Sequence, residues 1–66
     1  MEETKTAEFD GAALYKNNNG EMFTLRLESK GVSKSLLVFP GEAARLKEAM
    51  EKQDKSMLND SIYRIR

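Results

Sequence analysis

Hydrophobic and polar residues alternate most clearly over residues 21–28, which read EMFTLRLE. Phe23, Leu25 and Leu27 occupy every second position of this segment. The positions between them hold Met22, Thr24 and Arg26. A period of two is typical of a β-strand with one face buried. The pattern therefore predicts a strand whose three apolar side chains point inward and whose other side chains point outward.

Turn-forming residues flank this strand on both sides. Residues 17–20 read Asn-Asn-Asn-Gly and residues 30–31 read Lys-Gly, and residues of these types tolerate the positive φ of tight hairpin turns. Residues 12–16 are therefore predicted as the first arm of a hairpin, and residues 32–39 as a further strand. Pro40 ends that strand, because proline cannot donate a hydrogen bond to a neighbouring strand.

The period of the hydrophobic pattern changes to that of a helix after residues 40–42, whose Pro-Gly-Glu sequence suits a helix start. One apolar stripe at helical spacing comprises Ala43, Leu46, Ala49, Met50 and, if the helix continues, Met57. The two methionines are predicted to fill the core. On the polar side, Glu48 and Lys52, and likewise Glu51 and Lys55, are spaced to form ion pairs along a helix.

The segment Asn-Asp-Ser at residues 59–61 predicts the end of this helix. Residues 61–66, SIYRIR, are then either a short final strand or a tail that packs on a partner. The predicted fold class is α+β: an antiparallel meander of three to four strands followed by one amphipathic helix. Residues 11–66 form the single domain. Residues 1–10, with four acids against one lysine, are an acidic leader that is either disordered or the first strand.

The strand over residues 32–39 is apolar on both faces. Leu36 and Val38 point one way, while Leu37 and Phe39 point the other. One helix in a chain of 66 residues covers only one face of a sheet, so the other face needs a cover from outside the chain. We expect Leu37, Phe39 and Met22 to form the interface of a homodimer. The alternatives are a platform for a ligand, and a strand end at which Leu37 or Phe39 folds back.

Composition restricts the chemistry of the chain. It has no cysteine and no histidine, which excludes disulfides, Cys/His zinc sites, thiol nucleophiles and acid–base catalysis by histidine. Eleven basic residues balance eleven acids, and the acids read as solvated charge rather than as metal ligands. We therefore expect no enzymatic activity, no cofactor and no metal. No apolar run is long enough to span a membrane, and a cytoplasmic location is expected.

One combination of basic and aromatic residues suggests a binding site. The five aromatic residues lie on or beside the predicted strands. A sheet face that presents aromatic rings and cations can stack unpaired bases and contact the phosphate backbone. The candidate residues are Tyr15, Lys16, Arg26, Lys30 and Lys34. The alternative interpretation is that the aromatic residues form the core and the cations only keep the sheet edges soluble.

Residues 14–50 resemble one repeat of the PUR domains, which bind purine-rich elements, and the related single-stranded nucleic-acid binders of the Whirly and positive-coactivator type. The resemblance is carried by the Asn-Gly turn at residues 19–20, the alternating strand, the Glu-Ser-Lys that follows it, and the Phe-Pro before the helix. It implies a dimer of ββββα units whose curved sheets bind single-stranded DNA or RNA through the five candidate residues. The balanced charge and an acidic first strand over residues 4–9 depart from that pattern.

The sequence thus predicts a binding module without catalysis, which holds single-stranded DNA or RNA on the sheet face of a homodimer, in a role such as transcription regulation. The alternative is a small protein–protein interaction module, such as an antirepressor-like regulator, that acts through its apolar sheet face.

Overall fold

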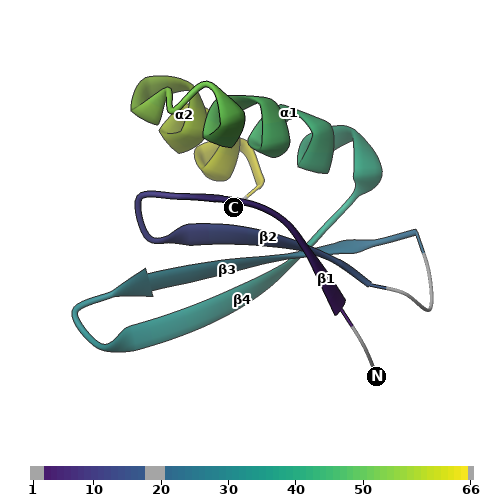
Figure 1. Cartoon of the computed structure of the whole chain (residues 1–66), viewed down its shortest axis with the longest axis horizontal. Coiled ribbons are helices and arrows are strands. Elements are labelled where there is room, and N and C mark those ends of the chain that lie inside the picture. Colours follow the sequence, from purple (N-terminus) through teal and green to yellow (C-terminus); the bar gives the residue numbers. More distant parts are fainter. Residues whose placement is uncertain (1–2, 18–20, 66) are drawn as a thin grey trace.

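The computed structural model describes residues 3–17 and 21–65 (Figure 1). Four antiparallel strands form one sheet in the order β1-β2-β3-β4, and both helices lie on the same face of it. The elements are β1 (Glu3–Phe9), β2 (Ala12–Asn17), β3 (Phe23–Ser29), β4 (Val32–Val38), α1 (Pro40–Glu51) and α2 (Lys55–Ile65). The predicted α+β class, with a meander followed by helix, is confirmed. The acidic leader supplies the first strand.

Two of the hairpins close through two-residue turns with positive φ. Asp10 and Gly11 have φ values of 51° and 82°, and Lys30 and Gly31 have 51° and 80°. This combination defines the type I′ turn, whose twist matches that of the flanking strands. The turn at Lys30-Gly31 is confirmed, whereas the one at Asp10-Gly11 was not predicted. The predicted Asn-Gly turn lies outside the described residues.

The core lies between the sheet and the two helices. Leu14, Leu25 and Val38 of the sheet are fully buried, as is Leu46 of α1. The predicted inward face of β3 is confirmed, because the half-buried Phe23 and Leu27 also pack against this core. The remaining buried hydrophobic residues are Ala12, Ala43, Ala49, Met50 and Leu58. The predicted apolar stripe is therefore confirmed for its four residues in α1, whereas Met57 belongs to the next helix, where it is half-buried against the core.

The C-terminal segment forms a second helix, so the single helix, the stop at residues 59–61 and the final strand over residues 61–66 were wrong predictions. The chain leaves α1 after Glu51, reverses at Gln53, which has a φ of 54°, and enters α2. Burial explains the helix, because apolar or small residues recur every three to four positions and face the core. They are Leu58, Ser61, Ile62 and Ile65. Residue 66 is not described.

The break between the helices also decides which ion pairs form. Lys52 Nζ lies 2.8 Å from Glu48 Oε2, as the helical spacing predicted, and this hydrogen bond raises the pKa of Lys52. The predicted pair of Glu51 with Lys55 was wrong, because α1 ends between the two residues. Lys55 Nζ lies 3.3 Å from Oδ2 of Asp10, in the β1–β2 turn. This ion pair joins the start of α2 to the sheet.

Asp54 caps the N-terminus of α2. Its Oδ1 accepts a hydrogen bond of 3.0 Å from the backbone N–H of Met57, and its carbonyl accepts one of 2.9 Å from Leu58. We expect Asp54→Ala to lower the free energy of unfolding by about 1 kcal/mol, because the first turn loses its acceptor. Asp54→Asn keeps the acceptor and should cost much less. Urea unfolding followed by circular dichroism measures both, and equal losses would contradict the capping role.

Candidate interaction surface

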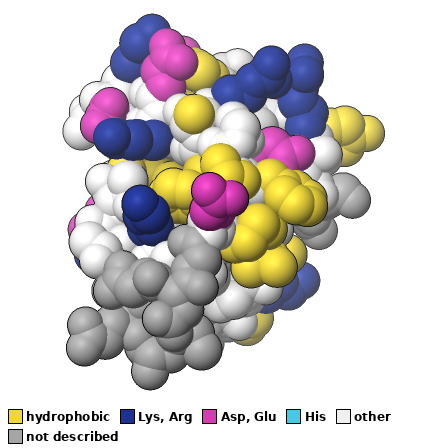
Figure 2. Space-filling model, turned by 90° about the vertical axis from the view of Figure 1, so that its right-hand side faces the viewer, with side chains coloured by type: hydrophobic (Ala, Val, Ile, Leu, Met, Phe, Trp, Pro, Cys, Tyr) yellow, Lys and Arg dark blue, Asp and Glu magenta, His cyan; other side chains and the backbone are white. Residues whose placement is uncertain are grey.

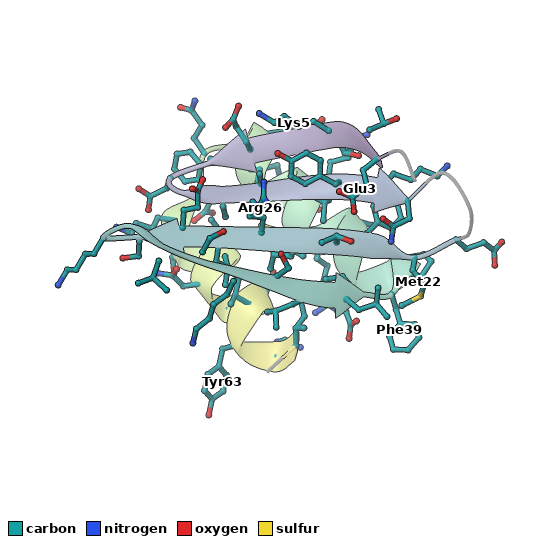
Figure 3. The ribbon with its side chains drawn as sticks, turned by 90° about the horizontal axis from the view of Figure 1, so that it is seen from below. Glu3, Lys5, Met22, Arg26, Phe39 and Tyr63 are labelled. Carbon is teal, nitrogen blue, oxygen red and sulfur yellow. The ribbon has the colours of Figure 1, made fainter. Side chains whose placement is uncertain are left out.

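The face of the sheet opposite the helices is uncovered, and it carries alternate residues of all four strands (Figure 3). Strand pairing arranges these side chains in rows across the sheet. One row runs Lys5, Tyr15, Thr24 and Leu37, from β1 to β4. The neighbouring row runs Glu8, Ala13, Arg26 and Ser35. We call this surface the open face.

A tyrosine flanked by two cations lies on the open face. Lys5 is directly opposite Tyr15 on β1. Arg26 on β3 is opposite Ala13, which places it diagonally from Tyr15 at a separation that long side chains can bridge. Tyr15 is half-buried and Arg26 is exposed. Arg26 makes no ion pair with any residue in the described ranges. Within these ranges no carboxylate competes for its guanidinium group, which can therefore bind a ligand.

The open face is not a basic surface. Its two cations, Lys5 and Arg26, are outnumbered by three carboxylates, those of Glu3, Glu8 and Glu28. Lys5 Nζ donates a hydrogen bond of 2.9 Å to Glu8 Oε1, which raises the pKa of Lys5. Both partners of this ion pair are exposed, so the pair is weak and a ligand phosphate can replace the carboxylate. Any anion bound here meets few positive charges.

The five candidate residues do not all meet on one surface. Tyr15 and Arg26 share the open face, but Lys16 pairs with Phe23 and Lys34 with Leu27, which places both lysines on the side of the helices. Lys30 lies in the turn at the end of the sheet. Lys5, which was not among the predicted site residues, joins Tyr15 instead. The sequence left open whether residues 1–10 are disordered or form the first strand, so Lys5 could not be assigned to a face of the sheet.

Large apolar side chains are exposed at one end of the open face. Leu37 and Phe39 are 65% and 64% exposed, although Val38 between them is fully buried. Met22, half-buried, precedes β3 and lies beside Phe39 (Figure 3). The prediction that the strand after Gly31 presents apolar side chains on both faces is confirmed. We call Met22, Leu37 and Phe39 the apolar corner.

An open groove adjoins the apolar corner where α1 begins beside α2. Figure 2 looks onto this end of the molecule and shows a cluster of hydrophobic side chains bordered by charged ones. Phe39 contributes to the groove, which is further lined by Gly41, Glu42, Arg45, Ser61 and Arg64. Arg64 is engaged by Asp60, at 3.1 Å from its Nε. The groove contains no nucleophile with an adjacent base among the residues that line it.

Among residues 3–17 and 21–65, no three acidic, cysteine or histidine side chains come together in a way that could hold a metal ion. Nor is any helix in these ranges long and apolar enough to cross a membrane.

Comparison with family models, curated proteins and solved structures gave no match to this chain. The resemblance to PUR domains therefore stays a prediction. The function has to be argued from the geometry of the open face.

Proposed function

We propose that this protein is a binding module without catalysis, which holds single-stranded DNA or RNA on the open face of a homodimer. The observation that supports this function is the position of Tyr15 between Lys5 and Arg26 on a sheet face that no helix covers. Aromatic rings on such faces stack unpaired bases, and adjacent cations contact the phosphates that link them.

The charge of the open face favours a single strand over a duplex. Duplex binding depends mainly on many cations that neutralise phosphates, and the open face has two. A single strand offers its bases as well, and stacking one base on an aromatic ring contributes about 1–3 kcal/mol. Ser33 and Ser35 lie on the same face and provide small hydroxyl groups that can hydrogen-bond to bases. The Thr24 hydroxyl donates a hydrogen bond of 3.3 Å to Asn17 Oδ1, so toward a base it acts as an acceptor.

Two phosphate contacts give a shallow dependence of affinity on salt. Each contact with a single strand contributes about 0.7 to the slope of log affinity against log salt concentration. With Lys5 and Arg26 both engaged, we expect a slope of about −1.4.

Arg26→Glu is expected to weaken the binding of single-stranded oligonucleotides about tenfold or more, because it replaces a free cation on the open face with a repelling carboxylate. Lys16→Glu makes the same change of charge on the helix side of the adjacent strand and should change affinity little. Fluorescence anisotropy with single-stranded and duplex oligonucleotides of equal length measures both, and circular dichroism verifies folding. Equal losses in the two variants, or unchanged binding by Arg26→Glu, would refute the site.

A second function is favoured by the apolar corner, where Leu37 and Phe39 are mostly exposed. Exposed apolar clusters mark protein–protein interfaces. A small regulator that binds another protein through this corner would bind neither the single-stranded nor the duplex oligonucleotide. Its complex would be lost in Leu37→Asp and would depend little on moderate salt.

A further inference from the structure

The two edges of the sheet differ in their protection against pairing with another strand. The outer strand β1 is interrupted by a bulge between Lys5 and Ala7. It also carries three charged residues, and α1 packs against it. Bulges, charges and a covering helix are the devices by which natural proteins block an exposed sheet edge. The β1 edge is therefore protected against pairing with another strand.

The opposite edge, β4, has neither a bulge nor a row of charges, although α2 reaches past it on the helix side of the sheet (Figure 3). All of β4 is described, and it pairs with β3 without a bulge from Val38 to Val32. It contains no proline and only one charged residue, Lys34. Every residue from Val32 to Ser35 is exposed. This edge therefore presents a regular row of backbone N–H and C=O groups to another strand.

Exposed hydrophobic residues gather on the same side of the molecule. In the described part of the chain, four large hydrophobic side chains are exposed: Val32 (59%), Leu37 (65%), Phe39 (64%) and Tyr63 (80%). Two belong to β4 and Phe39 follows its end. Tyr63 projects from α2 beyond the β4 side of the sheet (Figure 3). Exposed apolar side chains thus lie at both ends of the free β4 edge.

We propose that β4 pairs antiparallel with β4 of a second copy of this chain. This inference rests on the homodimer of the proposed function and names the strand through which that homodimer forms. The two sheets join into one of eight strands. The two-fold axis passes between the two Ser35 residues, perpendicular to the sheet, so the helices of both copies lie on one side.

The direction of the backbone groups along β4 sets the possible registers. Val32 is paired directly with Ser29 across a two-residue turn, so its backbone groups point toward β3. Because these groups alternate along a strand, those of Ser33, Ser35 and Leu37 point away from β3, toward the free edge. Pairing Ser35 with Ser35 of the second copy brings these outward groups together and uses all seven residues of β4.

The same register is also the most compatible in its side chains. Val32 faces Val38 of the second copy, and Lys34 faces Leu36. If the register shifts so that each chain moves one residue toward the turn, Lys34 of one copy faces Lys34 of the other, and like charges directly opposite each other are destabilising. If each chain moves one residue in the opposite direction, Val32 of each copy lies beyond the end of β4 of the other and has no partner. Since the chain has no net charge, two copies do not repel each other at long range.

Pairing through β4 also extends the binding surface. Because the helices of both copies lie on the same side, the two open faces become one continuous face. Each copy contributes its own Tyr15 and Arg26 to it. A single strand of nucleic acid can then follow the combined sheet and contact both tyrosines.

A cysteine at position 35 tests the register directly, because the chain contains no cysteine of its own. In the proposed pairing the two Cα atoms of residue 35 lie about 5.5 Å apart, within the range for a disulfide. We expect Ser35→Cys to form a covalent dimer on mild oxidation, seen by non-reducing electrophoresis. The matched variant is Ser33→Cys, equally exposed on the same strand and face, whose two Cα atoms would lie about 14 Å apart. Equal cross-linking of both variants, or none of Ser35→Cys, would overturn the pairing.

Proline at position 35 tests the pairing of β4 with a second copy without the need for oxidation. Ser35→Pro removes only an N–H that points away from β3, so the circular dichroism spectrum should be kept. The mass from light scattering should fall from twice 7.5 kDa to 7.5 kDa. A variant that stays folded and dimeric would overturn the inference, as would a wild-type protein that is monomeric at the highest concentration tested. A dimer that binds no oligonucleotide would refute nucleic-acid binding but leave the β4 pairing standing. A monomer that binds them would refute the β4 pairing and the homodimer, but leave binding on the open face standing.

Discussion

Leu25→Ala is expected to leave most of the protein unfolded at 25 °C. Leu25 is fully buried in the centre of the sheet, and truncation of a leucine in such a place costs about 2–5 kcal/mol. A core in a chain of this size supplies only about 3–5 kcal/mol of stability in total. The substitution therefore removes most of the free energy of unfolding. Circular dichroism at 25 °C and urea unfolding at a fixed protein concentration measure it.

Leu25→Met is the matched control for this experiment. Methionine has nearly the same volume as leucine and adapts to the shape of the cavity, so the cost should stay below about 1.5 kcal/mol. If both variants lose the same stability, the position of Leu25 in the core does not explain the effect. If neither loses any, the packing of the sheet against the helices is refuted.

Gly11→Ala is expected to be the second most damaging change. Gly11 has a φ of 82°, and a Cβ added to it would lie 2.9 Å from the carbonyl oxygen of Glu28. The backbone of β3 is held close, because the N–H of Glu28 donates a hydrogen bond of 2.8 Å to the carbonyl of Gly11. The left-handed conformation and the steric overlap together should cost about 2–4 kcal/mol. Urea unfolding measures this loss.

Gly31→Ala separates the two contributions. Gly31 has nearly the same φ, 80°, but an added Cβ would meet no atom within 4 Å. Only the conformational cost remains, and we expect a loss of about 1 kcal/mol. Similar losses at both glycines would mean that the contact between the β1–β2 turn and β3 is not as close as described.

The strands and the core residues could be predicted where the local pattern of hydrophobic and polar residues matched the burial of those residues in the folded protein. The alternation around Leu25 identified both faces of β3, and the stripe through Leu46 identified the buried side of α1. Pro40 marked the end of β4 and the start of α1. These signals work because each residue's burial follows from its position within one regular element.

The second helix was not predicted, because its local signals conflict with its tertiary contacts. Asn59, Asp60 and Ser61 favour turns, and isoleucine and tyrosine favour strands. Packing against α1 outweighs these preferences, and Ser61 is small enough to be buried at the contact. The spacing of Leu58, Ile62 and Ile65 was the helical signal that the polar residues obscured.

The candidate site was only partly predictable from the sequence. Lys16 is two positions from the buried Leu14, so strand alternation already assigns it to the side of the helices. The same reasoning assigns Lys34, two positions from Leu36, to that side. The pairing of Lys5 with Tyr15 required the register across the bulge in β1, which no local pattern specifies.

The meander topology has a consequence for how the chain folds. Every strand pairs with its neighbour in sequence, so each step closes a short loop and the entropy lost per step is small. The helices that cover the apolar side of the sheet, however, come after all four strands in the chain. If the sheet forms first, Leu14 and Leu25 face water until α1 and α2 pack on it, and a chain in that state is prone to aggregation.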